Sequence, residues 1–366
     1  MEMLETIFPE ETSLCLPQEV LGDFVVNDSV ACKPVNGTVF ETGAPLFETH
    51  PGLAIPYLVI VSVALLVGTI GNSLILLVSA TTSGINKAGK EFIVNLALAD
   101  LCVSAVADPF CIVGVMKGER FFNGFPFMCE FVASMCLTAC FCAFLNLTCL
   151  TINRYFFVCH NEMYDFLFGR KTCIAICILT WPIAFVFEMP NIFGWGDHGF
   201  DTKNHSCIWD RTASLSYTLF VSIGLIGGPL MLMGFCYIMI FRYIWNSKKN
   251  LYKFETSDPN AMKKAWGETI RTSRTLFVVF CVFLTCWLPY AIVIALDVNN
   301  TFPMWLHLYV TLLAHLHSSA NCIVFATCNQ KFRQAVLKAL RCKTGTKSSF
   351  TSSSLPVSSV SSTRVS

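Results

Sequence analysis

Long apolar blocks separated by short polar connections run along most of this 366-residue chain. About 20 helical residues cross the hydrocarbon core of a membrane, and each block is about 22–30 residues long. Lipid offers no partner to unpaired backbone groups, so each block must be helical. The pattern predicts an all-α membrane protein, a bundle of seven transmembrane helices. The blocks lie at about 53–79, 91–116, 128–158, 172–193, 216–245, 272–297 and 304–328.

Polar segments at the two ends complete the predicted domain organisation. Residues 1–52 form an acidic N-terminal segment, and residues 53–328 form the transmembrane domain. Residues 329–342 are expected to form a short amphipathic eighth helix on the membrane surface. Residues 343–366 are rich in Ser and Thr and are expected to be disordered. Residues 1–20 lack the apolar core of a cleavable signal peptide, so we expect the first block to serve as an uncleaved insertion signal.

The distribution of Lys and Arg predicts the orientation of the chain. Residues 1–52 hold nine acidic residues and one basic residue, Lys33. With this segment outside, five of the 25 Lys and Arg residues fall on the outer side and 20 fall inside or at the inner interface. The positive-inside rule then predicts a multi-pass membrane protein with an external N-terminus and a cytoplasmic C-terminus. Four glycosylation sequons fall on the predicted outer side, at Asn27, Asn36, Asn204 and Asn299.

Composition excludes several classes of protein. The chain is 54% hydrophobic and 13% charged, whereas soluble domains average about 25% charged residues. This excludes a disordered chain and a soluble two-domain enzyme. The net charge is +1, so there is no overall positive field to attract nucleic acid.

Most of the 19 cysteines lie within the predicted spans, where a thiol behaves as a small apolar group. Cys129 and Cys207 fall on the outer side, in an oxidising environment, and are expected to form a disulfide. Cys15 and Cys32 either form a second bridge or stay free. Cys342 follows the amphipathic stretch, where a palmitoylated thiol would contact membrane lipid.

Polar side chains inside the spans point to function, because they are unfavourable in lipid. Asn72, Asp100 and Asn321 lie in three different spans at matching depths, which indicates one shared buried network. A lone Asn can also simply join two helices. Arg154, at the inner end of the third span, could extend to the interface without further function.

Taken in order, these landmarks resemble the rhodopsin-like (class A) G-protein-coupled receptors over about residues 53–341. The landmarks are Gly71-Asn72, Leu96 to Asp100, Cys129, Asn153-Arg154-Tyr155, Trp181, Cys207, Pro229, Tyr237, Cys286 to Pro289 and Asn321. Within this class, other segments are most similar to melatonin receptors. These segments are Ile152 to His160, Tyr164-Asp165, Pro190-Asn191, Thr275 to Phe280 and Asn329 to Arg333.

The resemblance implies a two-state receptor rather than an enzyme, with no cofactor. An outside ligand repacks the residues around Trp287, and the sixth helix swings about Pro289 to open a cytoplasmic cleft for a heterotrimeric G protein, with the inhibitory type favoured. A sodium ion would be held by Asp100 in a network with Asn72 and Asn321. The Ser/Thr-rich tail would bind arrestin. The residues expected to serve coupling are Asn153, Arg154, Tyr155, Tyr237 and Arg274.

Two departures from the class pattern affect the inner half. The seventh span reads Asn321-Cys-Ile-Val-Phe325, so the usual proline is Cys322 and the usual tyrosine hydroxyl is lost at Phe325. A contact between the seventh helix and Tyr237 through that hydroxyl is therefore not expected. Asn153 stands where most of the class has an acid, so no ion pair with Arg154 forms there.

The ligand is expected to be a small molecule bound between the outer halves of the helices. The stretch one turn below Cys129 has no carboxylate, which argues against an amine, and the seventh span has no Lys for a Schiff base. Trp287 and His315 are expected to contact the ligand. Two further residues then point to different ligands, Asn191 to a melatonin-like molecule and Arg211 to a carboxylate.

The Arg211 hypothesis rests on a loop that resembles the one in the medium-chain fatty acid receptor, and an Arg fork suits a carboxylate. Alternatively, Arg211 pairs with Asp210 or Asp197 and binds nothing, or the ligand belongs to neither class. A membrane transporter remains a weaker alternative, supported by Asp100 alone. An intramembrane enzyme is disfavoured because His315 and His317 point away from each other on one helix.

Overall fold

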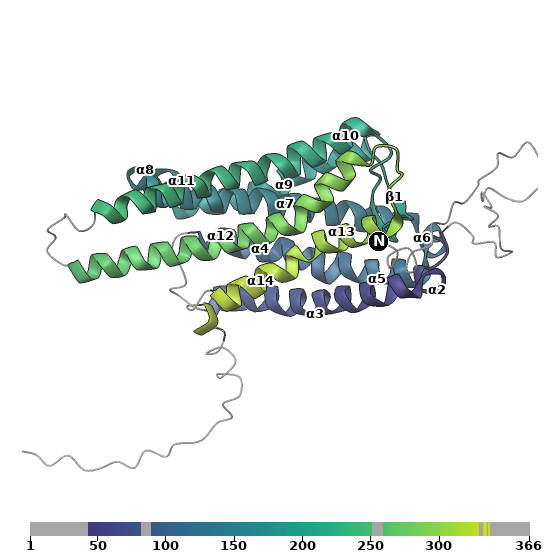
Figure 1. Ribbon diagram of the computed structural model, residues 1–366, viewed down its shortest axis with the longest axis horizontal. Coiled ribbons are helices and arrows are strands. Elements are labelled where there is room, and N and C mark those ends of the chain that lie inside the picture. The colour runs from purple at the N-terminus through teal and green to yellow at the C-terminus, as the bar shows by residue number, and fades with distance from the viewer. Residues whose placement is uncertain (1–42, 82–88, 251–258, 329–331, 335, 337–366) are drawn as a thin grey trace, which may run out of the picture.

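The computed structural model describes residues 43–81, 89–250, 259–328, 332–334 and 336 (Figure 1). Within these residues, six continuous spans are long and apolar enough to cross a membrane, and a bent helix pair completes a seventh. The spans are α3 (Pro51–Thr81), α4 with α5 (Lys90–Cys102 and Asp108–Lys117), α7 (Pro126–Cys159), α9 (Arg170–Ile192), α10 with α11 (Leu215–Leu219 and Gly228–Asn250), α12 (Pro259–Leu296) and the pair α13 and α14 (Met304–His315 and His317–Cys328). The predicted seven-helix bundle is confirmed.

Shorter elements connect the spans. They are the helices α2 (Leu46–Thr49), α6 (Glu119–Asn123) and α8 (Asn161–Leu167) and the strands β1 (His198–Asp201) and β2 (Ser206–Trp209). The two strands pair antiparallel, with Gly199 opposite Ile208 and Phe200 opposite Cys207. This hairpin lies across one end of the bundle (Figure 1), which is called the hairpin end below.

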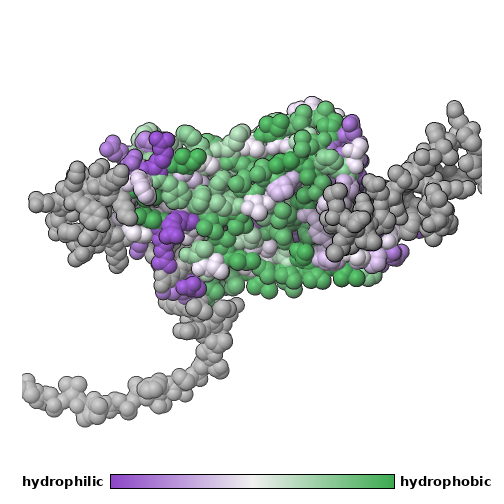
Figure 2. All heavy atoms as spheres, viewed as in Figure 1, coloured by the Kyte–Doolittle hydropathy of each residue, from purple (hydrophilic) through white to green (hydrophobic). Residues whose placement is uncertain are grey.

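The face of the bundle shown in Figure 2 is apolar along most of its length. Large side chains such as Ile70, Ile178 and Met231 are 59%, 64% and 69% exposed. A soluble protein would cover a continuous apolar belt of this kind, whereas lipid solvates it. The chain is therefore a multi-pass membrane protein.

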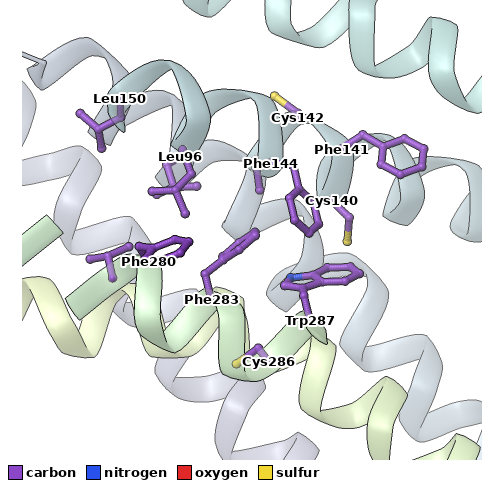
Figure 3. Packing of buried hydrophobic residues seen from close by; sticks show 14 of the residues in the cluster. Leu96, Cys140, Phe141, Cys142, Phe144, Leu150, Phe280, Phe283, Cys286 and Trp287 are labelled. Atoms are coloured by element: carbon purple, nitrogen blue, oxygen red, sulfur yellow. The ribbon is translucent and has the colours of Figure 1, made fainter. Parts of the chain in front are cut away.

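The core is centred on α7, which packs against α4, α9, α11 and β2. Figure 3 shows Phe144 of α7 pointing toward Phe283 and Trp287 of α12. The Phe144 ring lies edge-on to both, with centroids 4.7 Å from Phe283 and 4.9 Å from Trp287. Such edge-to-face contacts stabilise the packing beyond the burial of area. The aromatic cluster joins the two helices halfway along the bundle.

Three spans are interrupted by local changes of helical geometry. π-helical segments, Val103–Ala107 and Phe220–Gly227, precede Pro109 and Pro229. Each proline lacks a backbone N–H, so one hydrogen bond of the helix cannot form there. The wider π-helical turn accommodates this loss, and the span continues without a break. The seventh span bends by 40° between His315 and His317, although no proline is present.

Side-chain hydrogen bonds explain the bend in the seventh span. The ring Nδ1 of His317 contacts the carbonyl of Ala314 at 2.7 Å. The hydroxyls of Ser318 and Ser319 donate to the carbonyls of His315 and Leu316, at 3.0 and 3.1 Å. These side chains compete with the backbone for its carbonyls and so bend the helix.

The hairpin is fastened to two different helices. Cys207 of β2 forms a disulfide with Cys129 of α7, with an S–S distance of 2.01 Å, which confirms the predicted bridge. His198 of β1 lies 2.8 Å from the carboxylate of Glu188 on α9, and both side chains are buried. The hairpin is therefore a fixed cover over the helix ends.

Little of the predicted eighth helix is described. Residues 332–334 and 336 are helical, and Phe332 is buried against the main core. Cys342, Cys15, Cys32, Asn27, Asn36 and the Ser/Thr-rich tail lie outside the described residues.

Candidate functional site

A small cavity lies between the helices beneath the hairpin. Its walls come from α7, α12, α13, β2 and the π-helical segment before α11. They include Cys136, Cys140, Trp209, Trp287, Tyr290 and His315. The cavity has about 30 Å³ of free space, whereas a drug-sized ligand needs roughly 300 Å³ or more. In this conformation it has room for about one water molecule.

The indole of Trp209 forms part of the wall of this cavity. It is 3% exposed, and its Nε1 donates a hydrogen bond of 3.0 Å to the hydroxyl of Tyr290 on α12. Its ring lies edge-on to Tyr217, with centroids 5.7 Å apart. The loop therefore inserts a large aromatic side chain between the helices.

The structure places the four predicted ligand residues in different environments. Trp287 and His315 are on the cavity wall, but Asn191 and Arg211 are not among its lining residues. The Nδ2 of Asn191 donates to the hydroxyl of Tyr217 at 2.9 Å. A Cβ on Gly196 would meet the Oδ1 of Asn191, so the chain passes closely over this amide.

Arg211 pairs with residues that the sequence analysis did not name. Its Nη1 lies 3.6 Å from Asp297, and its Nε lies 3.6 Å from Asp201. Its Nη2 donates to the Oδ1 of Asn300 at 2.5 Å. The alternative that Arg211 pairs with Asp210 or Asp197 is wrong in its partners, because the fold brings Asp201 of β1 and the loop between α12 and α13 against the guanidinium instead. Arg211 and these three partners are called the Arg211 clasp.

Asp297 is the anionic centre of the Arg211 clasp. Burial by itself would raise its pKa, but hydrogen bonds from the backbone amides of Phe302 and Thr301 and from His307 lower the pKa to about 2. Lys203 lies 3.9 Å from the same carboxylate and adds to this effect. The carboxylate of Asp297 therefore stays ionised over the whole physiological range of pH.

A carboxylate that the sequence analysis missed holds the imidazole of His315. Asp108 of α5 is 1% exposed, and its Oδ1 lies 3.0 Å from the Nδ1 of His315. The other ring nitrogen, Nε2, lies 3.8 Å from the Sγ of Cys136. The sequence could have identified Asp108, because this acidic residue falls within a predicted span just as Asp100 does.

The predicted polar network forms around Asp100. Asn321 donates to the Oδ2 of Asp100 at 2.9 Å, and Asn72 donates to the carbonyl of Ser318 at 3.0 Å. The other carboxylate oxygen, Oδ1, lies 3.5 Å from the Nε2 of His317. Asp100 therefore meets Asn321 and His317, whereas Asn72 contacts the same helix α14 through the carbonyl of Ser318.

The donor set of this network suits a hard cation in part. The Oδ1 atoms of Asp100, Asn72 and Asn321 are buried and have no hydrogen-bond donor among the described residues. Hard cations take oxygen ligands, so these atoms fit sodium, while Ala143 of α7 offers no side-chain oxygen. No group of three His, Cys, Asp or Glu residues that could hold a metal is found in the described part of the chain.

The predicted coupling residues lie at the end of the bundle opposite the hairpin. Arg154 is 4% exposed, and its guanidinium carbon lies 5.6 Å from the ring centroid of Phe157. The amide of Asn153 donates to the hydroxyl of Tyr164 on α8 at 3.3 Å. An acid at this position would instead form an ion pair with Arg154. The hydroxyl of Tyr155 lies 3.0 Å from His160.

Helices α11 and α12 meet near the same end through aromatic side chains. The ring of Tyr237 packs against Phe277 and Phe280, with centroids 5.3 Å away in both cases. Arg271 and Arg274 are exposed on α12. A movement of α12 would therefore separate the Tyr237 contacts and expose the region around Arg154.

Two of the four sequons lie in the described residues. Asn204 is 2% exposed, and its amide donates to Asp201 at 2.9 Å and accepts from Thr311 at 2.8 Å. Asn299 is exposed in the loop between α12 and α13. The folded chain thus presents Asn299 for a glycan and keeps the Asn204 amide inside.

Comparisons with known proteins agree with this architecture. The family model described as "7 transmembrane receptor (rhodopsin family)" matches residues 71–325. The chain is 30% identical to melatonin receptor type 1C of Gallus gallus, over 81% of this chain and 84% of the relative. It is 29% identical to melatonin receptor type 1B of Homo sapiens, over 75% of each chain.

Among solved structures, the chain shares its fold with squid rhodopsin. The TM-score is 0.70 at 18% identity, over 80% of this chain and 86% of that one. The matched family consists of receptors, which confirms the prediction that the chain is not an enzyme. The family match and the seven-helix bundle together show that the chain belongs to the rhodopsin family of seven-transmembrane receptors, and that it is similar to melatonin receptors.

Proposed function

We propose that the chain is a cell-surface receptor whose hairpin end, with the N-terminus, faces outward and binds a small molecule in the cavity around Trp287. Coupling to a heterotrimeric G protein follows from membership of the family. The observation that carries the proposal is the aromatic cluster of Phe144, Phe283 and Trp287, which joins α7 to α12 and in which Trp287 lines the cavity. A ligand that moves Trp287 would thereby move α12.

A neutral, melatonin-like molecule is the ligand class that the relatives favour, because the similar proteins are melatonin receptors. The competing hypothesis of a medium-chain fatty acid needs a cation in the cavity. Arg211 is already neutralised by Asp201 and Asp297 and does not line the cavity, so no observation favours a carboxylate. The transporter hypothesis has no support from the comparisons.

The opposite end of the bundle would face the cytoplasm and bind the G protein. Arg154 would contact the C-terminal helix of the α subunit, with Arg271 and Arg274 at the rim of the opened cleft. An inhibitory-type G protein is proposed because the chain is similar to melatonin receptors. Arrestin would bind the Ser/Thr-rich tail, and a palmitate on Cys342 would contact lipid.

Replacement of Arg154 by Ala tests the coupling proposal. The variant should reach the surface at the normal level but lose nucleotide exchange on an added inhibitory G protein, because the buried guanidinium becomes the contact in the open state. Exchange is measured in membranes with purified G protein. Arg170→Ala, at the start of α9 with a side chain 83% exposed, is the matched control and should leave exchange almost unchanged. Full exchange in Arg154→Ala would contradict the assignment.

The sodium proposal for Asp100 has its own test. Sodium should lower agonist affinity in the unmodified receptor, and Asp100→Asn should remove that dependence because the anionic ligand is gone. Agonist binding is measured in sodium and in matched potassium. If sodium has no effect on affinity, the cation does not bind at this site.

A further inference from the structure

His315 is the polar group of the cavity with the most defined surroundings. Its Nδ1 is held 3.0 Å from Asp108, which does not line the cavity. Its Nε2 faces Cys136, which does. Cys111 also approaches Nδ1, at 4.0 Å. The nitrogen available to a ligand is therefore Nε2.

The net charge of the Asp108–His315 pair decides whether Nε2 carries a proton and can donate a hydrogen bond. No Lys or Arg lines the cavity, so a net negative charge on this buried pair would have no partner there and would be strongly unfavourable. A neutral pair carries two titratable protons. The Oδ2 of Asp108 is buried and has no hydrogen-bond partner among the described residues, so a proton there would have no acceptor and is placed instead in the contact between Oδ1 and Nδ1. The second proton then sits on Nε2, whether the carboxyl or the imidazole holds the first. In both arrangements Nε2 is a hydrogen-bond donor.

That donor has only a weak acceptor in the present conformation. Its neighbour is the sulfur of Cys136 at 3.8 Å, and a thiol sulfur accepts poorly. An oxygen at about 2.9 Å would satisfy the N–H far better. The nearby side chains Trp209, Trp287 and Tyr290 offer flat aromatic surfaces for the rest of a ligand.

We infer that the cavity selects an uncharged, mainly aromatic ligand through one acceptor oxygen, a carbonyl or an ether, which takes the proton of His315 Nε2. An ammonium ligand would meet a donor and no acidic lining residue. A carboxylate would add an unpaired negative charge beside Asp108. This inference rests on the proposed function, since it names the ligand class of the same cavity. It adds Asp108 as a positioning residue.

The first experiment examines the proton itself in the unmodified receptor. The full-length chain is labelled with ¹⁵N-histidine in lipid nanodiscs, and the His315 signals are identified among the seven histidines by their loss in His315→Gln. Nitrogen NMR should show a proton on Nε2 of His315. An unprotonated Nε2 would overturn the inference, and no ligand is needed for this measurement.

The second experiment uses four bicyclic probes of nearly equal shape. They are an acetylnaphthalene, the ethylnaphthalene that lacks its oxygen, a naphthylethylamine and a naphthoic acid. Binding is followed by thermal shift on the full receptor and on Trp209→Ala, in which removal of the indole leaves space for the rings. The ketone should bind at least about tenfold more tightly than the other three, as expected for one hydrogen bond worth about 1.4 kcal/mol.

Variants at His315 and Thr311 test which lining residue causes the preference for the ketone. His315→Leu should abolish the advantage of the ketone over the ethyl compound, and His315→Gln should retain part of it through the amide N–H. Thr311→Val is the matched control, because its hydroxyl already donates to Asn204 at 2.8 Å, and it should keep the full preference.

Several results would overturn the inference. They are equal binding of the ketone and the hydrocarbon, tighter binding of the amine or the acid, a preference that survives in His315→Leu, and no binding of the ketone to Trp209→Ala. None of these measurements requires a G protein. Failed nucleotide exchange together with an intact ketone preference would therefore refute the proposed function without refuting the inference.

Discussion

The guanidinium of Arg211 is almost completely buried between Asp201 and Asp297. Removal of one partner from a buried ion pair leaves the other charge without compensation, which typically destabilises a protein by about 3 kcal/mol or more. Arg211→Ala should therefore lower the thermal unfolding midpoint of the receptor in detergent. The matched control is Asp210→Asn, at the preceding residue, whose carboxylate accepts from Thr212 and forms no ion pair with Arg211. An unchanged midpoint in Arg211→Ala would contradict a structural role and reopen the carboxylate hypothesis.

Single residues also show where reasoning from the sequence succeeded and where it could not. Asp100 and Asn321 were found because polar groups in lipid need partners, and the structure brings them together. Asp108 obeys the same rule and was overlooked. The partner Asp297 lies in a different loop from Arg211, so no local pattern could identify it.

The hairpin is the element that closes the cavity, and its position depends on a close approach to α5. A Cβ on Gly114 would collide with the backbone carbonyl of His205 in the turn of the hairpin. Gly114→Ala should push the hairpin outward, so that the Cys129–Cys207 disulfide is reduced faster by a mild thiol reagent. Thiol labelling followed by mass spectrometry measures the rate.

The hairpin itself offers a control for this prediction. Gly199 in β1 has nothing within 4 Å of the position that a Cβ would occupy, so Gly199→Ala should leave the reduction rate unchanged. Equal rates in Gly114→Ala and the unmodified receptor would show that the hairpin does not rest on Gly114.

The seven spans were predictable because a helix that crosses lipid must be long and apolar, and each block of the sequence has that length and composition. The bend after His315 was not predicted, since it depends on serine and histidine side chains that take backbone carbonyls rather than on a proline. The insertion of Trp209 between the helices was also beyond the sequence, because it depends on how the hairpin crosses the bundle.

The stability of the whole molecule should depend on pH through His205. Burial lowers the pKa of this loop histidine to about 4, whereas the unfolded chain has a value near 6.5. The unfolded state therefore binds a proton first as the pH falls, and stability is lost between pH 6.5 and 4 by up to about 3 kcal/mol. Above pH 6.5 both states are neutral and the effect is absent.

Thermal midpoints across this range test the prediction. His205 has a positive φ of 47°, which Asn also tolerates, so His205→Asn removes the titration without straining the turn. The variant should show a shallower loss of stability in acid than the unmodified receptor. Because Asp297 has a pKa of about 2, its carboxylate remains ionised throughout this window. Identical curves for both proteins would exclude His205 as the cause.

The position of Trp209 between two attachments bears on the rate of ligand association. The strand that carries it is tied to α7 by Cys207 and is followed closely by the Arg211 clasp. If the hairpin end faces outward as proposed, an arriving ligand would meet about 30 Å³ of free space, so this strand would have to shift before the ligand could enter. Association is then governed by a preceding conformational step rather than by diffusion. The observed rate should level off as ligand concentration rises, at the speed with which the strand opens.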